Sequence, residues 1–78
     1  MRPRRAEDLL SMARRHVAEG EERVARQEIL IAELDHDGHA ELAVKARALF
    51  TMFQTSLQLL RNDLSRIESE SRQSGVPE

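Results

Sequence analysis

The residues best suited to chemistry lie in one short polar stretch, Asp-His-Asp-Gly-His at residues 35–39. Carboxylate and imidazole groups are common ligands of divalent metals, and Glu33 with His36 has the Glu-x-x-His spacing of di-iron helical bundles. In those bundles the motif points inward and further glutamates join it, whereas Glu33 and His36 occupy outward helical positions here. We interpret the stretch as a solvated polar turn and keep a metal-binding tip as the weaker alternative.

Other residue types that could support catalysis are present without the arrangement that catalysis requires. His16 could act as a general base only beside a nucleophile or a substrate pocket, and the sequence supplies neither. The serines lack a nucleophile elbow, the three glycines are isolated, and there is no cysteine. We therefore predict a protein that is not an enzyme and that has no cofactor, no metal and no small-molecule substrate.

The composition favours long helices. The 78 residues suffice for one domain with a small core. Phe50 and Phe53 are the only aromatic residues, and the two prolines lie near the ends, at Pro3 and Pro77. A charged fraction of 33% combined with a proline-free run of this length is typical of helices that pack along their sides.

Two heptad seams flank the polar stretch. Apolar or small residues recur at alternating steps of three and four in each half of the chain, which predicts helices over about 6–36 and 40–72, with a turn at about 36–40. The seams are Leu10, Ala13, Val17, Gly20, Val24, Gln27, Ile31 and Leu34, followed by Ala43, Ala46, Phe50, Phe53, Leu57, Leu60, Leu64 and Ile67.

The two seams are complementary when the chain folds back on itself. In an antiparallel pair, facing residue numbers sum to a constant, and a sum of 77 places Gly20 opposite Leu57 and the small Ala43 opposite Leu34. Large residues opposite small ones allow the layers to interdigitate. Gly38 is the expected cap of the first helix because glycine adopts a left-handed conformation without steric cost, and Asp37 or His39 would begin the second helix. The ends are predicted to be a basic lead-in at 1–5 and a disordered tail at 73–78.

Three polar residues lie on or beside the seams. We interpret Gln27, Ser56 and Asp63 as boundary positions with access to solvent. The alternative for Gln27 is that it specifies the register, as a buried polar residue can at some cost in stability.

Several large apolar residues remain outside the seams, which implies a second buried face. The simplest way to cover it is the packing of two identical hairpins as a four-helix bundle, an isologous homodimer, although helices of another protein could complete the bundle instead. The orientation of such a dimer stays open. The candidates for the self-interface are Leu42, Leu49, Met52, Leu59, Ile29 and Leu30, with Leu9 beside them.

A nucleic-acid-associated regulator is the alternative function. Arg2, Arg4 and Arg5 could form a basic patch at one end of the hairpin. The net charge of -2, the acidic middle of the first helix and the lack of stacking aromatics argue against this role. We therefore regard nucleic acid as an unlikely partner.

Parts of the first helix and the turn resemble a group of short, uncharacterised proteobacterial proteins, common in rhizobia and their relatives, that form helical hairpins. The resemblance covers about residues 12–60 and rests on His-Val-Ala-Glu-Gly-Glu at 16–21, Arg-Val-Ala-Arg-Gln at 23–27, Ile-Ala at 31–32 and Asp-Gly-His at 37–39. It implies a bacterial source and a small helical protein, and it transfers no activity or catalytic residue. At Ala40 the group often has a polar capping residue, so the start of the second helix departs from the group.

Taken together, the sequence predicts an all-α antiparallel two-helix hairpin, similar to a coiled coil, that dimerises into a four-helix bundle. Its predicted role is a non-enzymatic protein-interaction or regulatory module. With no apolar run of membrane-spanning length, a cytoplasmic location is expected and no membrane partner. The candidate partner surface on the first helix consists of His16, Glu19, Arg23 and Arg26.

Overall fold

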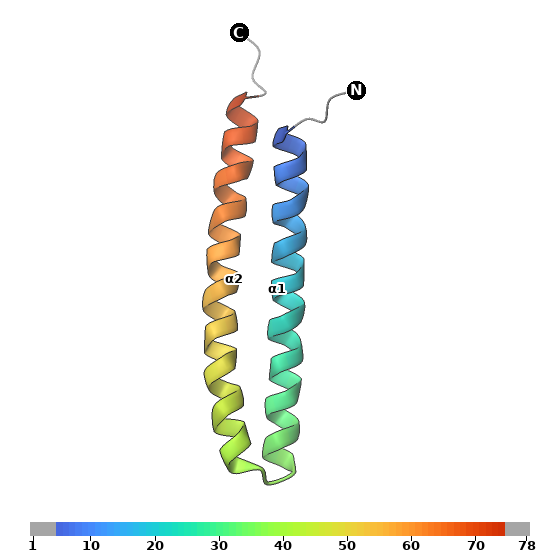
Figure 1. Ribbon diagram of the computed structural model, residues 1–78, viewed down its shortest axis with the longest axis vertical. Coiled ribbons are helices and arrows are strands. Elements are labelled where there is room, and N and C mark those ends of the chain that lie inside the picture. Colours follow the sequence, from blue (N-terminus) through green and yellow to red (C-terminus); the bar gives the residue numbers. More distant parts are fainter. Residues whose placement is uncertain (1–4, 75–78) are drawn as a thin grey trace.

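The computed structural model describes residues 5–74 and consists of two long helices packed side by side (Figure 1). Helix α1 spans Arg5–His36 and helix α2 spans Ala40–Ser74, and the chain reverses direction between them. The principal extents are 62 × 23 × 13 Å, so the molecule is a single layer of two helices. The predicted all-α antiparallel hairpin is confirmed.

The hairpin turn is built around Gly38. Its φ of 79° places it in the left-handed region, and the amides of Gly38 and His39 donate to the carbonyls of Asp35 and Leu34 at 3.2 and 2.9 Å. This pair of bonds is a Schellman motif, which satisfies carbonyls that the end of α1 leaves free. The carbonyl of His39 accepts from the amide of Ala43 at 2.9 Å, so His39, rather than Asp37, caps α2.

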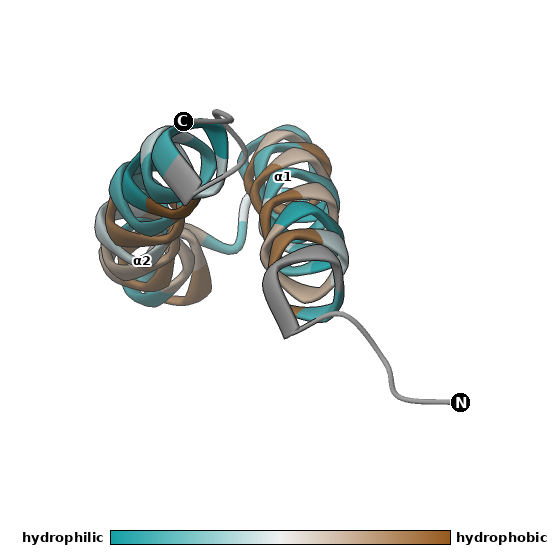
Figure 2. Ribbon diagram, turned by 90° about the horizontal axis from the view of Figure 1, so that it is seen from above, coloured by the Kyte–Doolittle hydropathy of each residue, from teal (hydrophilic) through white to brown (hydrophobic). Residues whose placement is uncertain are grey.

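The core is the pair of seams that the heptads predicted. Every seam residue is buried or half-buried, and the two helices turn these apolar sides toward each other (Figure 2). The buried members of the seams are small apolar residues, one leucine and one glutamine: Ala13, Val17, Gly20, Ala43, Ala46, Leu57 and Gln27.

Gly20 shows that the predicted register is correct. A Cβ added to Gly20 would lie 3.1 Å from Leu57 Cδ1 and 3.4 Å from Leu60 Cδ1. The leucine side chains therefore occupy the space that glycine leaves open. This close approach compensates for the helix propensity that glycine lacks, about 1 kcal/mol relative to alanine.

Two predicted boundaries differ from the structure. Helix α2 continues to Ser74, so residues 73–74 are helical and not part of a disordered tail. No glycine or proline lies between Ala40 and Ser74, and Arg72 lies in the last turn, where the helix dipole favours a cation. Helix α1 begins at Arg5, one residue earlier than predicted. The rest of the predicted lead-in and tail lies outside the described residues.

Gln27 is buried, so the prediction that it has access to solvent was wrong. Its side chain retains 8% exposure, and its Nε2 donates to the main-chain carbonyl of Ala46 at 2.9 Å across the helix pair. Ser56 and Asp63 are exposed, as the boundary interpretation predicted. Gln27 thus links the two helices at one level of the seam.

Candidate functional site

The two broad faces of the hairpin differ in chemistry, and the difference follows from the heptad positions beside the seams. In an antiparallel pair, e positions of one helix face e positions of the other, and g positions face g positions on the opposite side. We call the e side the ion-pair face; its residues are Arg14, Glu21, Glu28 and Asp35 of α1 and Arg47, Gln54, Arg61 and Glu68 of α2.

Ion pairs join the two helices at three of the four levels of the ion-pair face. Arg61 lies 3.1 Å from Glu21, Arg14 lies 3.8 Å from Glu68, and Arg47 pairs with Asp35 near the turn. Glu28 and Gln54 occupy the fourth level and line an open groove with the Asp35–Arg47 pair. Six of the seven charged side chains on this face therefore have partners in the same chain, and the groove at the fourth level also exposes Ile31, Ala32 and Phe50.

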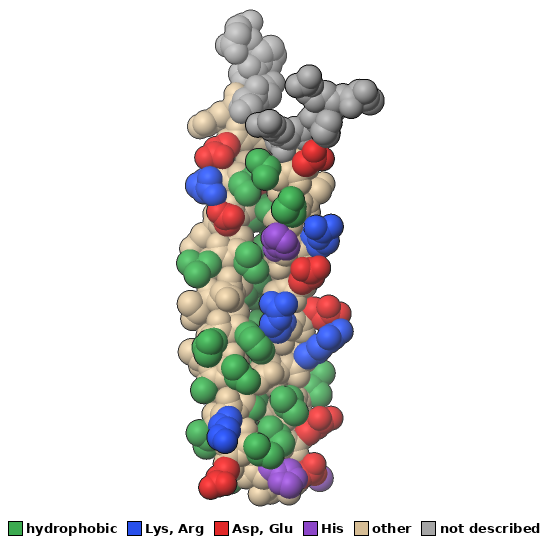
Figure 3. Space-filling view, in the orientation of Figure 1, with side chains coloured by type: hydrophobic (Ala, Val, Ile, Leu, Met, Phe, Trp, Pro, Cys, Tyr) green, Lys and Arg blue, Asp and Glu red, His purple; other side chains and the backbone are tan. Residues whose placement is uncertain are grey.

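The opposite side carries exposed apolar residues on α2. We call this set the leucine face; it consists of Leu42, Leu49, Met52 and Leu59 of α2 with Leu30 of α1. These side chains are 41–63% exposed. Figure 3 shows hydrophobic side chains following both helices through the middle of this side. Five large apolar side chains along one side of a single-layer protein form the kind of surface that marks an interaction site.

Near the turn, the leucine face is hollowed into a groove. The groove is lined by Leu30 and Leu34 of α1 and by Leu42 and Leu49 of α2, with Gln27, Lys45 and Ala46 at its base and edge. Leu30 and Leu42 occupy facing g positions, so each helix contributes a wall. The groove gives the leucine face a concave end.

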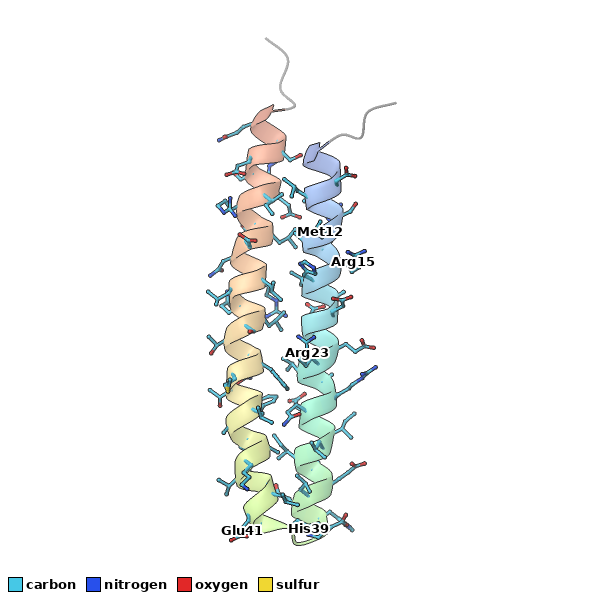
Figure 4. The ribbon with its side chains drawn as sticks, in the orientation of Figure 1. Met12, Arg15, Arg23, His39 and Glu41 are labelled. Carbon is cyan, nitrogen blue, oxygen red and sulfur yellow. The ribbon has the colours of Figure 1, made fainter. Side chains whose placement is uncertain are left out.

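The predicted partner surface on α1 lies on the same side of the hairpin as the leucine face. We call His16, Glu19, Arg23 and Arg26 the charged flank; all four are exposed and occupy g or c positions. In Figure 4, Met12 and Arg23 lie on the viewed side of α1. The structure thus brings together two sets of residues that the sequence analysis treated separately.

Two arginines of the charged flank already have contacts within the chain. The guanidinium of Arg23 lies 5.8 Å from the centroid of the Phe53 ring, within the range of a cation–π interaction. Arg26 forms an exposed ion pair with Glu22 at 3.3 Å, one helical turn earlier. An open groove beside them is lined by Glu19, Glu22, Arg23, Arg26, Gln27 and Phe53. Its walls are mainly charged, which distinguishes it from the apolar groove near the turn.

Beyond Leu59, the same side of α2 becomes charged. Arg66 contacts Asp63 and lies 3.3 Å from Glu70. The hydrogen bond that Arg66 donates to Asp63 is the largest cause, and the negative charges of Asp63 and Glu70 follow; together they raise the pKa of Arg66 above its usual value. Arg66 therefore stays cationic and ends the apolar run of α2.

The structure shows two exposed apolar residues that the predicted interface did not include, Met12 and Val44, and places one of the candidates on another side. Met12 occupies a c position of α1 on the side of the leucine face, at 42% exposure, near Leu9, which the sequence had already placed beside the candidates and which is 52% exposed. The heptad position of Met12 is the signal that could have found it. Val44 is exposed at a b position, and Ile29 lies at an f position on the back of α1. Ile29 is therefore not part of the leucine face.

The polar turn is exposed at every residue from 35 to 39. Nδ1 of His36 lies 3.3 Å from Asp37 and faces solvent. Within residues 5–74, no group of three or more histidine, cysteine, aspartate or glutamate side chains is placed to hold a metal ion. Of the arginines proposed for nucleic acid, Arg2 and Arg4 lie outside the described residues.

Comparison with protein-family models, with curated proteins and with solved structures finds no match. The resemblance to short proteobacterial hairpin proteins therefore stays a prediction. Neither described helix combines the length and hydropathy that crossing a bilayer requires.

Proposed function

We propose that this hairpin is a non-enzymatic, cytoplasmic protein-interaction module that works as a homodimer through its leucine face. The observation that supports the proposal is the asymmetry between its two sides. The ion-pair face carries three ion pairs between the helices, whereas Leu42, Leu49, Met52 and Leu59 of α2 are exposed along one side.

The energetics of a two-helix protein support the same proposal. A single layer of two helices buries each helix on one side only, and a chain of this size has little core to offset the entropy of ordering. Burial of an apolar side chain contributes about 1.5–3 kcal/mol. A second copy seated on the leucine face would contribute this gain from both subunits.

In this proposal the charged flank contacts other proteins. His16, Glu19, Arg23 and Arg26 lie beside the leucine face and stay at its edge when α2 is covered. Charged residues at the edge of an interface set specificity and association rate more than affinity. The dimer would therefore supply stability, and α1 would supply recognition.

The test is the solution mass over a dilution series, measured by sedimentation, with helicity followed by circular dichroism on the same samples. A dimer whose helicity falls as it dissociates supports the proposal. A folded monomer at every concentration contradicts it.

A matched pair of variants assigns the interface. Leu49→Asp places a charge on the leucine face, and Ala48→Asp places the same charge on the neighbouring exposed position at the back of α2. We expect Leu49→Asp to weaken the dimer by on the order of 100-fold, because the symmetric interface receives the charge twice. Ala48→Asp should leave the dissociation constant unchanged. Equal effects of the two variants would contradict the assignment to the leucine face.

A further inference from the structure

Helix α2 carries a second heptad seam beside the seam that packs against α1. Its g and c positions follow one another at alternating steps of three and four, as the seam toward α1 does. These positions are Leu42, Lys45, Leu49, Met52, Ser56 and Leu59. Each is exposed, so the seam is free within the single chain. A seam of this spacing is the element that coiled-coil helices use to pair.

The second seam reads nearly the same in both directions. Its two ends are leucines, Leu42 and Leu59, and its two central residues are Leu49 and Met52. An antiparallel pair of identical helices places each g residue opposite a c residue, so that facing residue numbers again sum to a constant. A sum of 101 places each leucine or methionine of this seam opposite another leucine or methionine.

We propose that two copies of this chain dock through α2 in an antiparallel arrangement, with Leu42 against Leu59 of the second copy and Leu49 against Met52 of the second copy. The two hairpin turns then lie at opposite ends of the dimer. This proposal rests on the homodimer proposed above and adds its orientation and register. The two-fold axis crosses α2 midway between Phe50 and Thr51.

Charge disfavours the parallel arrangement of the same two helices. In a parallel pair each residue faces its own copy, so Lys45 would meet Lys45 and Asp63 would meet Asp63 along the seam. Like charges facing each other in a partly desolvated interface are destabilising. In the antiparallel arrangement Lys45 faces Ser56, and its long stem can reach solvent at the edge.

The neighbouring antiparallel registers lose apolar pairs. If the register shifts by one heptad toward the C-terminal end of α2, Leu42 faces Arg66 of the second copy. Arg66 stays cationic beside Asp63 and Glu70. If the register shifts by one heptad toward the N-terminal end of α2, Leu49 faces Lys45 of the second copy. Leu59 then has no facing residue, because its opposite position precedes the start of α2. The proposed register alone pairs the four large apolar residues with one another.

The position of the charged residues on α1 favours a contact centred on α2. The c positions of α1 include the charged residues Glu19 and Arg26. The corresponding c positions of α2 include the apolar residues Met52 and Leu59. Packing through α2 buries the apolar c positions and leaves the charged ones in water. Packing of α1 of one copy on α2 of the other would bury Glu19 and Arg26 against leucines, which costs several kcal/mol per ion.

Cysteine cross-linking tests the orientation, because the chain has no cysteine of its own. The reagents are Leu42→Cys, Leu59→Cys and the double variant Leu42→Cys/Leu59→Cys, each oxidised under native conditions and resolved without reductant. Positions 42 and 59 lie roughly 25 Å apart on one helix, so a disulfide within the chain is impossible. The altered side chains are exposed, and circular dichroism of each variant checks that the hairpin still forms.

We expect most of the double variant to become covalent dimer. Each single variant should form no more covalent dimer than random collisions produce. Cross-linking of Leu42→Cys with itself would overturn the antiparallel arrangement. A second double variant, Leu49→Cys/Leu59→Cys, serves as the register control. Preferential cross-linking of this control would show the register shifted by one heptad and would overturn the pairing proposed here.

Sedimentation of the unmodified chain separates the two proposals. A monomer at all concentrations would refute the homodimer and this arrangement together. A dimer whose double variant Leu42→Cys/Leu59→Cys fails to cross-link would refute only the arrangement and would leave the homodimer standing.

Discussion

The side-chain amide of Gln27 donates a hydrogen bond to the main-chain carbonyl of Ala46, 2.9 Å away on the opposite helix. It is a polar contact inside an otherwise apolar seam, and Gln27 is the buried polar residue of the core. Any shift of one helix along the other would separate this donor from its acceptor and bury an unpaired amide. The contact therefore favours one register at the expense of a fully apolar seam.

Replacement of Gln27 should separate its contribution to packing from its contribution to register. Gln27→Ala removes the hydrogen bond and leaves a cavity, and we expect a loss of about 1–2 kcal/mol in the free energy of unfolding. Gln27→Leu fills the space with apolar atoms and should cost less than Gln27→Ala. Urea unfolding followed by circular dichroism measures both values. A larger loss for Gln27→Leu than for Gln27→Ala would show that leucine does not fit the seam.

The contact between Gly20 and Leu57 predicts that size at one position is coupled to size at the other. Gly20→Leu should lower the free energy of unfolding by about 1–3 kcal/mol because the new side chain meets Leu57 in a filled space. Adding Leu57→Ala to Gly20→Leu should restore part of the lost free energy of unfolding. The matched control is Leu57→Ala in the parent chain, which leaves a cavity and should be destabilising by itself. Additive effects in this double-mutant cycle would contradict the coupling.

The left-handed conformation of Gly38 predicts a graded response to substitution. No atom lies within 4 Å of an added Cβ, so the cost of a side chain is conformational and not steric crowding. We expect Gly38→Ala to lower stability by about 1 kcal/mol, and Gly38→Asn to cost less because asparagine tolerates this conformation. Thermal unfolding compares the two variants. Equal losses would indicate that the turn can adopt another geometry.

The ion-pair face should contribute little to stability, although it carries three ion pairs between the helices. Glu21 and Arg61 are each about half exposed, at 53% and 48%, and exposed pairs contribute about 0.2–1 kcal/mol. A double-mutant cycle with Glu21→Gln and Arg61→Gln should give a coupling energy within this range, and the coupling should decrease in 1 M salt. The same variants should leave the solution mass unchanged. A coupling of several kcal/mol, or a change in mass, would assign this face a larger role.

Most of the hairpin could be predicted from the sequence because helix pairing depends on periodicity. All sixteen predicted seam positions are buried or half-buried, and Gly38 lies in the turn with the positive φ that glycine permits. Apolar residues at steps of three and four define the side that a helix buries, whatever it packs against. The boundaries were less predictable, since α2 continues to Ser74 through polar residues that no breaker interrupts.

The candidate site was only partly predictable. The exposed leucines of α2 and the charged residues of α1 were recognisable as residues outside the seams, but their common side was not, and Ile29, which the prediction grouped with the leucines, lies on the back of α1. Which side a residue occupies depends on its angle about the helix relative to the contact with the other helix. The heptad positions give that angle approximately, and the packed pair shows which side chains then lie together.

The sequence by itself determined the two helices, the turn at Gly38 and the register of the seam, because each follows from local conformation and from the spacing of apolar residues. The tertiary structure decided which residues of the two helices contact one another. It buried Gln27 against Ala46, placed Arg23 over Phe53, and divided the hairpin into an ion-pair face and a leucine face. These relationships join residues from opposite helices, and their distances depend on how the helices are rotated and offset when they pack.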